Sequence, residues 1–209
     1  MKSLNVLIAL LIFTAGINAQ QFKQDDVIPF DKNVKTGKLS NGMTYFIRSN
    51  KKPENRCELR LVVNAGSVLE DENQQGLAHF VEHMCFNGTK NFHKNELVNY
   101  LESIGMKFGP EINAYTSFDE TVYMLQLPTD NKDIMEKGFQ ILEDWAHNVS
   151  FDDDEIDRER GVITEEWRLG RGAAARLRDK QFPVLLKNSR YAERLPIGKV
   201  DIIKNFEHE

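Results

Sequence analysis

The chain of 209 residues is 41% hydrophobic and 28% charged, with a formal net charge of -5. This apolar content is enough for a packed core and excludes disordered, collagen-like and fibrous proteins. The 27 basic and 32 acidic side chains provide no positive surface for nucleic acid or for an anionic membrane. Two cysteines are too few for a disulfide-built scaffold. Composition therefore indicates a soluble globular domain.

The first 19 residues have the organisation of a secretory signal peptide. A lysine precedes the apolar run 4–14, and small residues lead to a cleavage site after Ala19. The run is shorter than the roughly 20 apolar residues that a membrane-spanning helix needs. We therefore predict an exported protein, periplasmic or secreted, with no membrane association after removal of the signal peptide. A buried N-terminal helix is the alternative.

The mature chain is expected to begin with a polar extended arm at 20–36, followed by one domain at 37–209. The segments 38–40 and 43–47 flank Asn41-Gly42, which is the strongest short hairpin signal in the chain. A β-hairpin is therefore predicted at the start of the domain.

Strand-like and helical patterns then follow one another along the chain. Residues 58–65 alternate between apolar and polar side chains, which predicts a strand with one buried face. Hairpins followed by helices indicate a layered α+β domain, in which a mixed or antiparallel sheet packs on helices. Further strands are predicted at 108–116 and 121–127, and helices at 74–86, 95–104, 131–148, 152–170 and 173–187.

The central motif of the chain is His79-Phe80-Val81-Glu82-His83. Residues four apart lie about 40° apart around a helix, so both imidazoles can reach one metal ion. Glu82 lies on the same face and can hold or deprotonate a metal-bound water. Two neutral imidazoles, one carboxylate and a water form the catalytic zinc arrangement. The alternative is an ordinary amphipathic helix, so the motif needs a third ligand.

The acidic segment 155–167 supplies candidates for that ligand. Glu159 and Glu166 are seven residues apart and share a helix face, whereas Glu165 points about 100° away. Glu166 is flanked by apolar residues, and a buried carboxylate is costly unless it is paired or metal-bound. We therefore predict Glu166 as the ligand and Glu159 as a partner in a supporting position. Solvated helix charges are the alternative for Glu159 and Glu165.

These motifs resemble the inverted-motif zinc peptidases, the family of pitrilysin, insulin-degrading enzyme and mitochondrial processing peptidase. The resemblance covers about 34–206 and is carried by segments 76–84, 86–90, 113–117 and 159–166. It implies one Zn²⁺ per domain, bound by His79, His83 and Glu166, with Glu82 as general base and Glu159 assisting.

The resemblance also implies where substrate binds. Asn113, Ala114 and Tyr115 would belong to an edge strand that receives the substrate peptide by β-augmentation. Pro110 within the predicted strand 108–116 agrees with an edge position. In the family, an Arg and a Tyr that help to bind substrate come from a second homologous half. No such half is present, so we expect a fragment that needs this half in cis or in trans and is a poor enzyme alone.

The remaining candidates carry less weight. His93 and His147 are expected to be capping or surface residues, and Cys57 and Cys85 to be free thiols rather than a disulfide. Aromatic residues Phe139, Trp145 and Trp167 are assigned to the core. A solvated face is expected for three arginines, with an acidic interior or a substrate carboxylate as the alternatives: Arg171, Arg176 and Arg178.

The predicted function is that of a zinc metalloendopeptidase domain that hydrolyses peptide bonds in peptides or unfolded proteins. The rival interpretation is a non-catalytic family member that serves as a peptide-binding or structural subunit. A zinc hydrolase that acts on esters but not on peptides is a third possibility.

Overall fold

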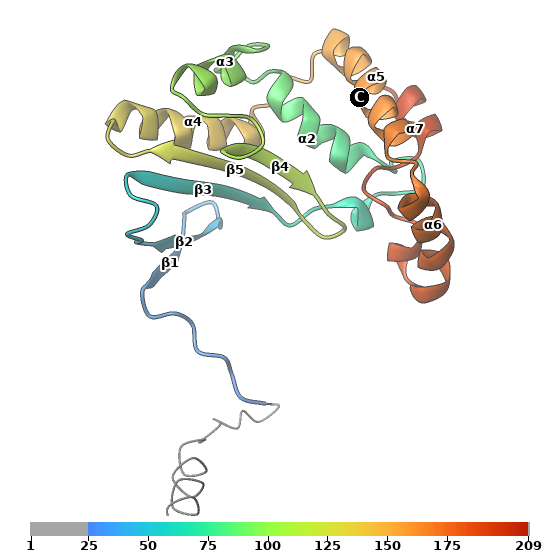
Figure 1. Ribbon diagram of the computed structural model, residues 1–209, viewed down its shortest axis with the longest axis horizontal. Coiled ribbons are helices and arrows are strands. Elements are labelled where there is room, and N and C mark those ends of the chain that lie inside the picture. Colours follow the sequence, from blue (N-terminus) through green and yellow to red (C-terminus); the bar gives the residue numbers. More distant parts are fainter. Residues whose placement is uncertain (1–24, 209) are drawn as a thin grey trace, which may run out of the picture. The chain divides into compact units, whose positions relative to one another are not determined.

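The computed structural model describes residues 25–208, which form two compact units with their boundary between Lys51 and Lys52 (Figure 1). The predicted signal peptide lies outside the described residues. Within the described part, no helix combines the length and the apolar character that a membrane crossing requires.

The first unit contains the predicted β-hairpin. Strand β1 (Val34–Lys38) pairs antiparallel with β2 (Thr44–Arg48). Asn41 Oδ1 accepts the backbone N–H of Met43 at 3.0 Å, and Gly42 takes a φ of 90°, which glycine adopts readily. The hairpin is thus confirmed at Asn41-Gly42, although its first strand begins inside the segment predicted as an extended arm.

The second unit is built on a three-stranded antiparallel sheet. Its strands are β3 (Arg56–Val63), β4 (Ile112–Thr116) and β5 (Thr121–Pro128), in the order β3-β5-β4. Alternate side chains such as Leu59, opposite Leu125, are buried, whereas Val62 on the other face is 50% exposed. One face of the sheet therefore carries the core, as the alternating pattern predicts.

Helices cover the apolar face of this sheet. In Figure 1, α2 (Leu77–Asn87) and α4 (Lys132–His147) lie over it, with α3 (Glu96–Ser103) beside them. Ile141 and Trp145 of α4 pack with Cys85 of α2 and with the strands in one buried cluster. The predicted α+β architecture of sheet and helices is confirmed.

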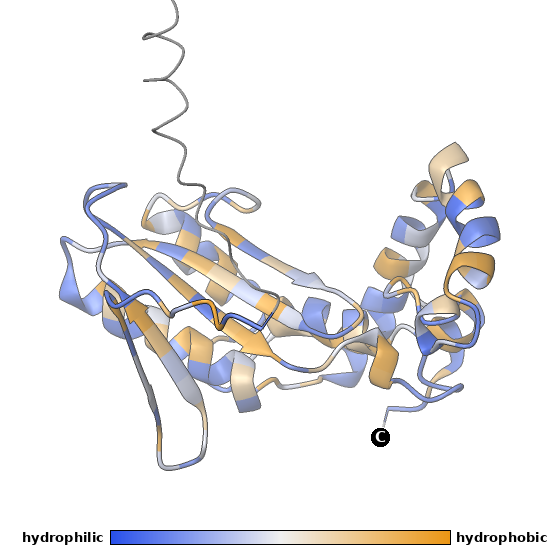
Figure 2. Cartoon of the chain, turned by 90° about the horizontal axis from the view of Figure 1, so that it is seen from below, coloured by the Kyte–Doolittle hydropathy of each residue, from blue (hydrophilic) through white to orange (hydrophobic). Residues whose placement is uncertain are grey.

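A second buried cluster joins α2 to the later helices. Helix α5 (Asp153–Leu169) contributes Ile156 and Ile163, and α7 (Val200–Asn205) contributes Ile203. They pack on Phe80 and Met84 of α2, while Cys85 of α2 belongs to the first cluster. Helix α2 is thus held by both clusters. Hydrophobic residues, orange in Figure 2, are distributed over the strands and helices of the chain.

The helix that follows α5 is less buried than the helices before it. Helix α6 (Ala173–Leu185) contains no buried residue, and short 3₁₀ turns lie at η1 (Ser67–Leu69) and η2 (Arg190–Ala192). Gly198, at φ 70°, lies so close to α2 that an added Cβ would be 2.3 Å from the Cα of Gly76. Only glycine therefore permits the segment before α7 to pack on the start of α2.

Several detailed predictions need correction. Strand β4 begins at Ile112, so Pro110 lies before the strand, although β4 is an edge of the three-stranded sheet. Phe139 is 59% exposed because α4 buries the side that carries Gly138, Ile141 and Trp145. Trp145 is a core residue, as predicted.

The two cysteines are free thiols. Cys85 is buried in the first cluster, and its Sγ donates to the hydroxyl of Tyr123 at 3.2 Å. Burial raises the pKa of Cys85 to about 12, so this thiol stays protonated at neutral pH. The interpretation of Cys57 and Cys85 as free thiols is confirmed.

Candidate metal centre

The motif helix α2 is capped by a side chain from the preceding loop. The Glu70 carboxylate accepts the N–H of Gly76 at 3.0 Å and of Ala78 at 2.8 Å. A negative charge at a helix N-terminus satisfies free N–H groups and complements the helix dipole. Burial raises the pKa of Glu70, and these two hydrogen bonds offset the rise only in part. The start of α2, two residues before His79, is thereby fixed.

Helices α2 and α5 bring the three predicted metal ligands together. Nε2 of His79 and Nε2 of His83 are 3.1 Å apart. Oε2 of Glu166 lies 3.7 Å from the first and 3.5 Å from the second. Among the described residues, these form the one group of three metal-ligating side chains whose donor atoms all lie within 4.8 Å of one another. The predicted residues thus converge across a sequence separation of more than 80 positions.

The donor set fits zinc. Zinc bonds of 2.0–2.1 Å in a tetrahedral site separate neighbouring ligand atoms by about 3.3 Å. The observed separations of 3.1, 3.5 and 3.7 Å bracket that value. Two imidazole nitrogens and one carboxylate oxygen are the set typical of catalytic zinc, which leaves a fourth position for water.

Glu159 supports this arrangement from behind His83. Its Oε1 lies 2.7 Å from Nδ1 of His83, and its Oε2 accepts the side-chain amide of Asn87 at 2.7 Å. Burial would raise the pKa of Glu159, but the hydrogen bonds from His83 and Asn87 outweigh it and lower the pKa. A charged carboxylate on the far nitrogen orients a ligating imidazole. The alternative of a solvated Glu159 is wrong, because its side chain is only 12% exposed.

The expected burial of Glu166 on an apolar helix face is wrong, although its carboxylate reaches the two imidazoles. Its side chain is 51% exposed, so it does not occupy the apolar, buried face of α5. Ile163 is buried on that helix, whereas Val162 is 51% exposed. Glu165 is exposed and pairs with Arg168, which confirms its interpretation as a solvated helix charge.

The two imidazoles have opposite pKa shifts. Burial, followed by the neighbouring charge of His83, lowers the pKa of His79 to about 4. His79 is therefore neutral at neutral pH, as a metal ligand must be. For His83, burial alone would lower the pKa, but the hydrogen bond and the charge of Glu159 outweigh the effect of burial and raise the pKa.

Glu82 occupies the position of the predicted general base. The residue lies in α2 directly before His83 and is 9% exposed. Thr116 Oγ1, at the end of β4, donates to its Oε2 at 2.6 Å. Burial raises the pKa of Glu82, and the bond from Thr116 reduces the rise. A carboxylate with a raised pKa accepts a proton more readily than an ordinary one.

These side chains open onto a cavity of about 630 Å³. Its lining includes Glu82, the three candidate ligands, Ala114, Tyr115 and Thr116 of β4, and the segment Leu195–Pro196–Ile197. The cavity is large enough for several residues of an extended peptide. The arrangement therefore joins a metal-ligand set, a buried carboxylate and a sheet edge in one open space.

Comparison with known sequences identifies the family. The sequence model of "Insulinase (Peptidase family M16)" matches residues 45–172, more than half of the chain. The chain belongs to peptidase family M16. The resemblance inferred from the motifs is confirmed.

The relatives of this M16 chain are longer proteins. "Probable zinc protease PqqL" of Haemophilus influenzae is 42% identical over 204 residues, which cover 98% of this chain and 22% of that protein. The crystal structure of the first half of the periplasmic protease PqqL from Escherichia coli is 42% identical. It has a TM-score of 0.84, over 88% of this chain and 39% of that chain.

Pitrilysin shows that the fold extends to more distant proteins. Its structure has a TM-score of 0.67 at 24% identity, over 88% of this chain and 19% of that chain. The similarity is to the fold alone. The M16 chain thus has the pitrilysin-like α+β fold and spans about a fifth of the first curated relative.

The structure places the other predicted site residues in different positions. Ala114 and Tyr115 line the cavity beside Glu82, whereas Asn113 does not. His93 and His147 lie outside the ligand group among the described residues. Two of the three residues predicted to bind substrate therefore line the same cavity as the motif residues His79, Glu82 and His83.

Sequence reasoning missed several residues of this M16 site. Asn87 and Thr116 lie in the segments 86–90 and 113–117 that carry the family resemblance, but no pattern in the sequence links Asn87 to Glu159 or Thr116 to Glu82, 34 positions away. Trp167, assigned to the core, is half-buried at the cavity. Arg171 and Arg178, predicted to lie on a solvated face, are 35% and 40% exposed and line the cavity near Asp179. Arg176 is exposed, as predicted.

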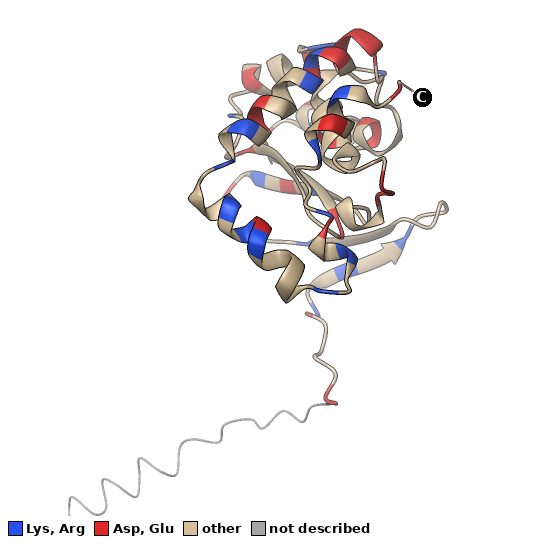
Figure 3. Cartoon of the chain, turned by 90° about the vertical axis from the view of Figure 1, so that its right-hand side faces the viewer, with Lys and Arg blue, Asp and Glu red and all other residues tan. Residues whose placement is uncertain are grey.

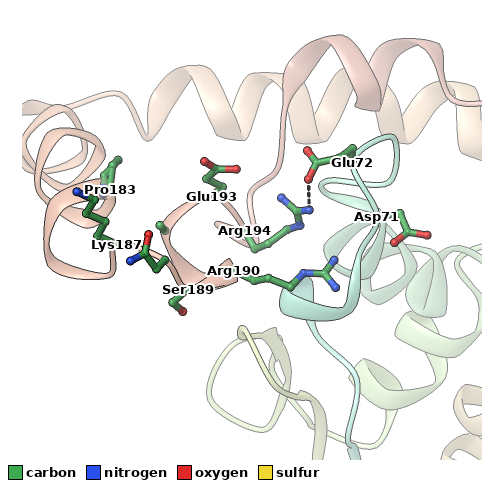
Figure 4. A pocket seen from close by; sticks show the side chains of 10 residues that line it. Asp71, Glu72, Pro183, Lys187, Ser189, Arg190, Glu193 and Arg194 are labelled. Carbon is green, nitrogen blue, oxygen red and sulfur yellow. Dashed lines mark hydrogen bonds and ion pairs between the residues drawn. The ribbon is translucent and has the colours of Figure 1, made fainter.

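A second cavity, of about 650 Å³, shares no lining residue with the first (Figure 4). Arg194 is 4% exposed, donates from Nε to the backbone oxygen of Glu70 at 3.0 Å and pairs with Glu72. Arg190 donates to the same backbone oxygen. Because Glu70 caps α2, these contacts tie the chain after α6 to the start of the motif helix. We interpret this second cavity as structural.

Proposed function

We propose that the chain is the zinc-dependent metalloendopeptidase domain of an exported protein and that it hydrolyses peptide bonds in peptides or unfolded proteins. The observation that carries this proposal is the convergence of the donor atoms of His79, His83 and Glu166 beside Glu82 in an open cavity. The names of the relatives, zinc proteases, agree with it.

Each side chain has a role in this proposal. His79, His83 and Glu166 would hold one Zn²⁺, and Glu159 would orient His83 through its Nδ1. When bound, zinc supplies a Lewis acid for the scissile carbonyl and lowers the pKa of a bound water to about 7. Glu82 takes the proton from the attacking water and gives it to the leaving amine.

Substrate would bind along the outer edge of β4. Among the described strands, β4 pairs only with β5. The N–H of Ala114 donates to Oδ1 of its neighbour Asn113 at 2.9 Å rather than to β5. Such an edge accepts an extended peptide as an added strand. Asn113, Ala114 and Tyr115 would then align the scissile bond with the cavity that contains Glu82.

A second homologous half, in the same polypeptide or in a partner subunit, would complete the active site with an Arg and a Tyr. The similarity of this chain to the first half of the E. coli protease supports that arrangement. Residues 1–19 would direct export, in agreement with the description of that relative as periplasmic.

Zinc content and peptide hydrolysis test this function in the full-length gene product. We expect His83→Ala to abolish bound zinc, while His147→Ala, a histidine exposed at the end of α4, retains it. Glu82→Gln should retain zinc but lower the rate of hydrolysis by about 10²–10⁴-fold.

The possible outcomes separate the interpretations. Equal zinc content in wild type and His83→Ala would refute the metal centre. Zinc binding without hydrolysis of any peptide or unfolded protein would favour the non-catalytic subunit. Turnover of esters but never of peptides would favour the third class, a zinc hydrolase that is not a peptidase.

A further inference from the structure

Two arginines that line the cavity have a single carboxylate, that of Asp179, near them. Arg171 follows α5 and Arg178 lies on α6, and both line the cavity that contains His79, His83 and Glu166. Their side chains are 35% and 40% exposed. Both guanidinium groups can therefore contact a molecule that occupies this cavity.

The local charges do not balance. Among the described residues, Asp179 is the only carboxylate within 4 Å of either guanidinium. Its Oδ2 pairs with Nη1 of Arg171, and its Oδ1 lies 3.7 Å from Nη2 of Arg178, beyond hydrogen-bond distance. Two positive charges thus share one negative charge. Within α6, the basic residues Arg176, Arg178 and Lys180 outnumber the acidic Asp179, and Figure 3 shows basic and acidic residues on the side of the molecule that carries α5, α6 and α7.

The nearby acidic residues are occupied by other donors. Glu82 accepts from Thr116, and Glu159 accepts from Asn87 and contacts His83. Glu166 faces the two imidazoles. Among the described residues, none of these carboxylates lies within ion-pair distance of Arg171 or Arg178.

Arg178 differs from Arg171 in its hydrogen bonding. Arg171 is held by Asp179 and lies over the ring of Trp167, with Cζ 4.8 Å from the ring centroid. For Arg178, Nε is buried and, like Oδ1 of Asp179, has no hydrogen-bond partner within the described part of the chain. A buried unpaired donor is unfavourable, so Arg178 has capacity for an additional acceptor.

The surroundings favour an anionic acceptor. Leu195, Pro196 and Ile197 form part of the wall of the same cavity. Apolar walls reduce screening by water and strengthen the attraction between opposite charges. A planar guanidinium binds a carboxylate through two parallel hydrogen bonds, which gives both affinity and orientation.

From this geometry we infer that Arg178, which shares the nearby Asp179 with Arg171, binds a carboxylate of the substrate in the cavity next to Glu166. That carboxylate is either an acidic side chain near the scissile bond or the C-terminal carboxylate of the peptide. The inference rests on the proposed peptidase function and adds a preference for acidic substrates.

The test uses the full-length gene product and matched peptides. One series carries Glu, Gln or Lys at single positions on either side of the scissile bond, and a second compares a free C-terminal carboxylate with an amide. We expect Arg178→Gln to lower kcat/KM for the carboxylate-bearing peptide by about 10–100-fold, and by less than about twofold for its neutral counterpart. Arg178→Glu should favour the Lys peptide.

Controls separate a binding role from a structural one. Lys180→Gln removes an exposed positive charge from the same helix outside the cavity and should leave the preference unchanged. Zinc content should remain that of the wild type in Arg178→Gln and Arg178→Lys. Peptide binding to the zinc-loaded Glu82→Gln protein, measured by fluorescence anisotropy, should show the same carboxylate preference without turnover.

The outcomes distinguish this inference from the proposed function. Hydrolysis of the Glu, Gln and Lys peptides at equal efficiency, with or without Arg178, would overturn the carboxylate site and leave the peptidase intact. If no peptide is hydrolysed, the peptidase proposal fails, and the anisotropy series still decides whether a carboxylate binds. If Arg178→Gln loses zinc, the inference is tested on the wild-type and Arg178→Lys proteins instead. Equal binding of acidic and neutral peptides by these proteins would overturn the inference.

Discussion

Helices α5 and α6 follow one another in the chain and both contribute to the cavity, but only α5 is anchored. Helix α5 buries Glu155, Ile156 and Ile163, whereas α6 buries no residue. Catalytic geometry has to be held within fractions of an ångström, which requires elements fixed by packing. The candidate ligand Glu166 and its neighbour Glu159 are accordingly on α5. Arg178, which we assign to substrate preference, is on the less buried helix.

Because α5 is packed through buried residues and α6 is not, we expect the stability of the protein to depend on α5. Ile163 is 0% exposed in the cluster with Phe80 and Ile203, so Ile163→Ala leaves a cavity between α5 and α2. We expect the free energy of unfolding to fall by about 2–5 kcal/mol. Val162→Ala, on the exposed side of the same helix, should change it by less than about 0.5 kcal/mol. Urea denaturation monitored by circular dichroism measures both, and similar losses would contradict this packing.

A second prediction concerns the support that α5 gives to the metal centre. Glu159→Gln removes the charge beside Nδ1 of His83, and we expect zinc affinity to fall by about 10–100-fold. Glu165→Gln, one position before Glu166, should leave the affinity unchanged because Glu165 contacts only Arg168 in the described structure. Competition with a chromogenic chelator measures both affinities. Equal affinities of Glu159→Gln and wild type would exclude Glu159 as the supporting carboxylate.

The third prediction concerns the pH dependence of Glu82. The base acts when it is ionised, so activity is lost as the pH falls through its pKa, which burial raises above the ordinary value. The hydrogen bond from Thr116 lowers that pKa, and Thr116→Val should therefore move the acid limb of kcat/KM to higher pH. Thr129→Val, at an exposed threonine after β5, is the control. A limb that stays in place in Thr116→Val would remove Glu82 as the titrating base.

The smallest effect is expected on α6. Leu185 is 73% exposed near the end of this helix, and Leu185→Gln should change the free energy of unfolding by less than about 0.5 kcal/mol. Zinc content should also be that of the wild type. A loss above about 1 kcal/mol in urea denaturation would show that α6 is anchored as firmly as α5.

Local sequence patterns determine several features of this protein. Asn41-Gly42 specifies its turn by backbone preference, and the alternation around Leu59 specifies a strand with one buried face. The spacing of His79 and His83 places two imidazoles on one face of a helix without any knowledge of the rest of the fold. The motifs were also sufficient to indicate the M16 family.

Tertiary structure alone decided what surrounds those motifs. The spacing of seven residues predicts that Glu159 and Glu166 share a face of α5. It does not predict that Glu159 is buried against His83 or that Glu166 is half exposed. The bond from Thr116 to Glu82 and the approach of Arg178 to the cavity join distant segments. Local periodicity specifies which side chains share a face of one element. Which face meets which neighbour depends on the packing of the whole domain, and this packing sets burial, pKa and the lining of the cavity.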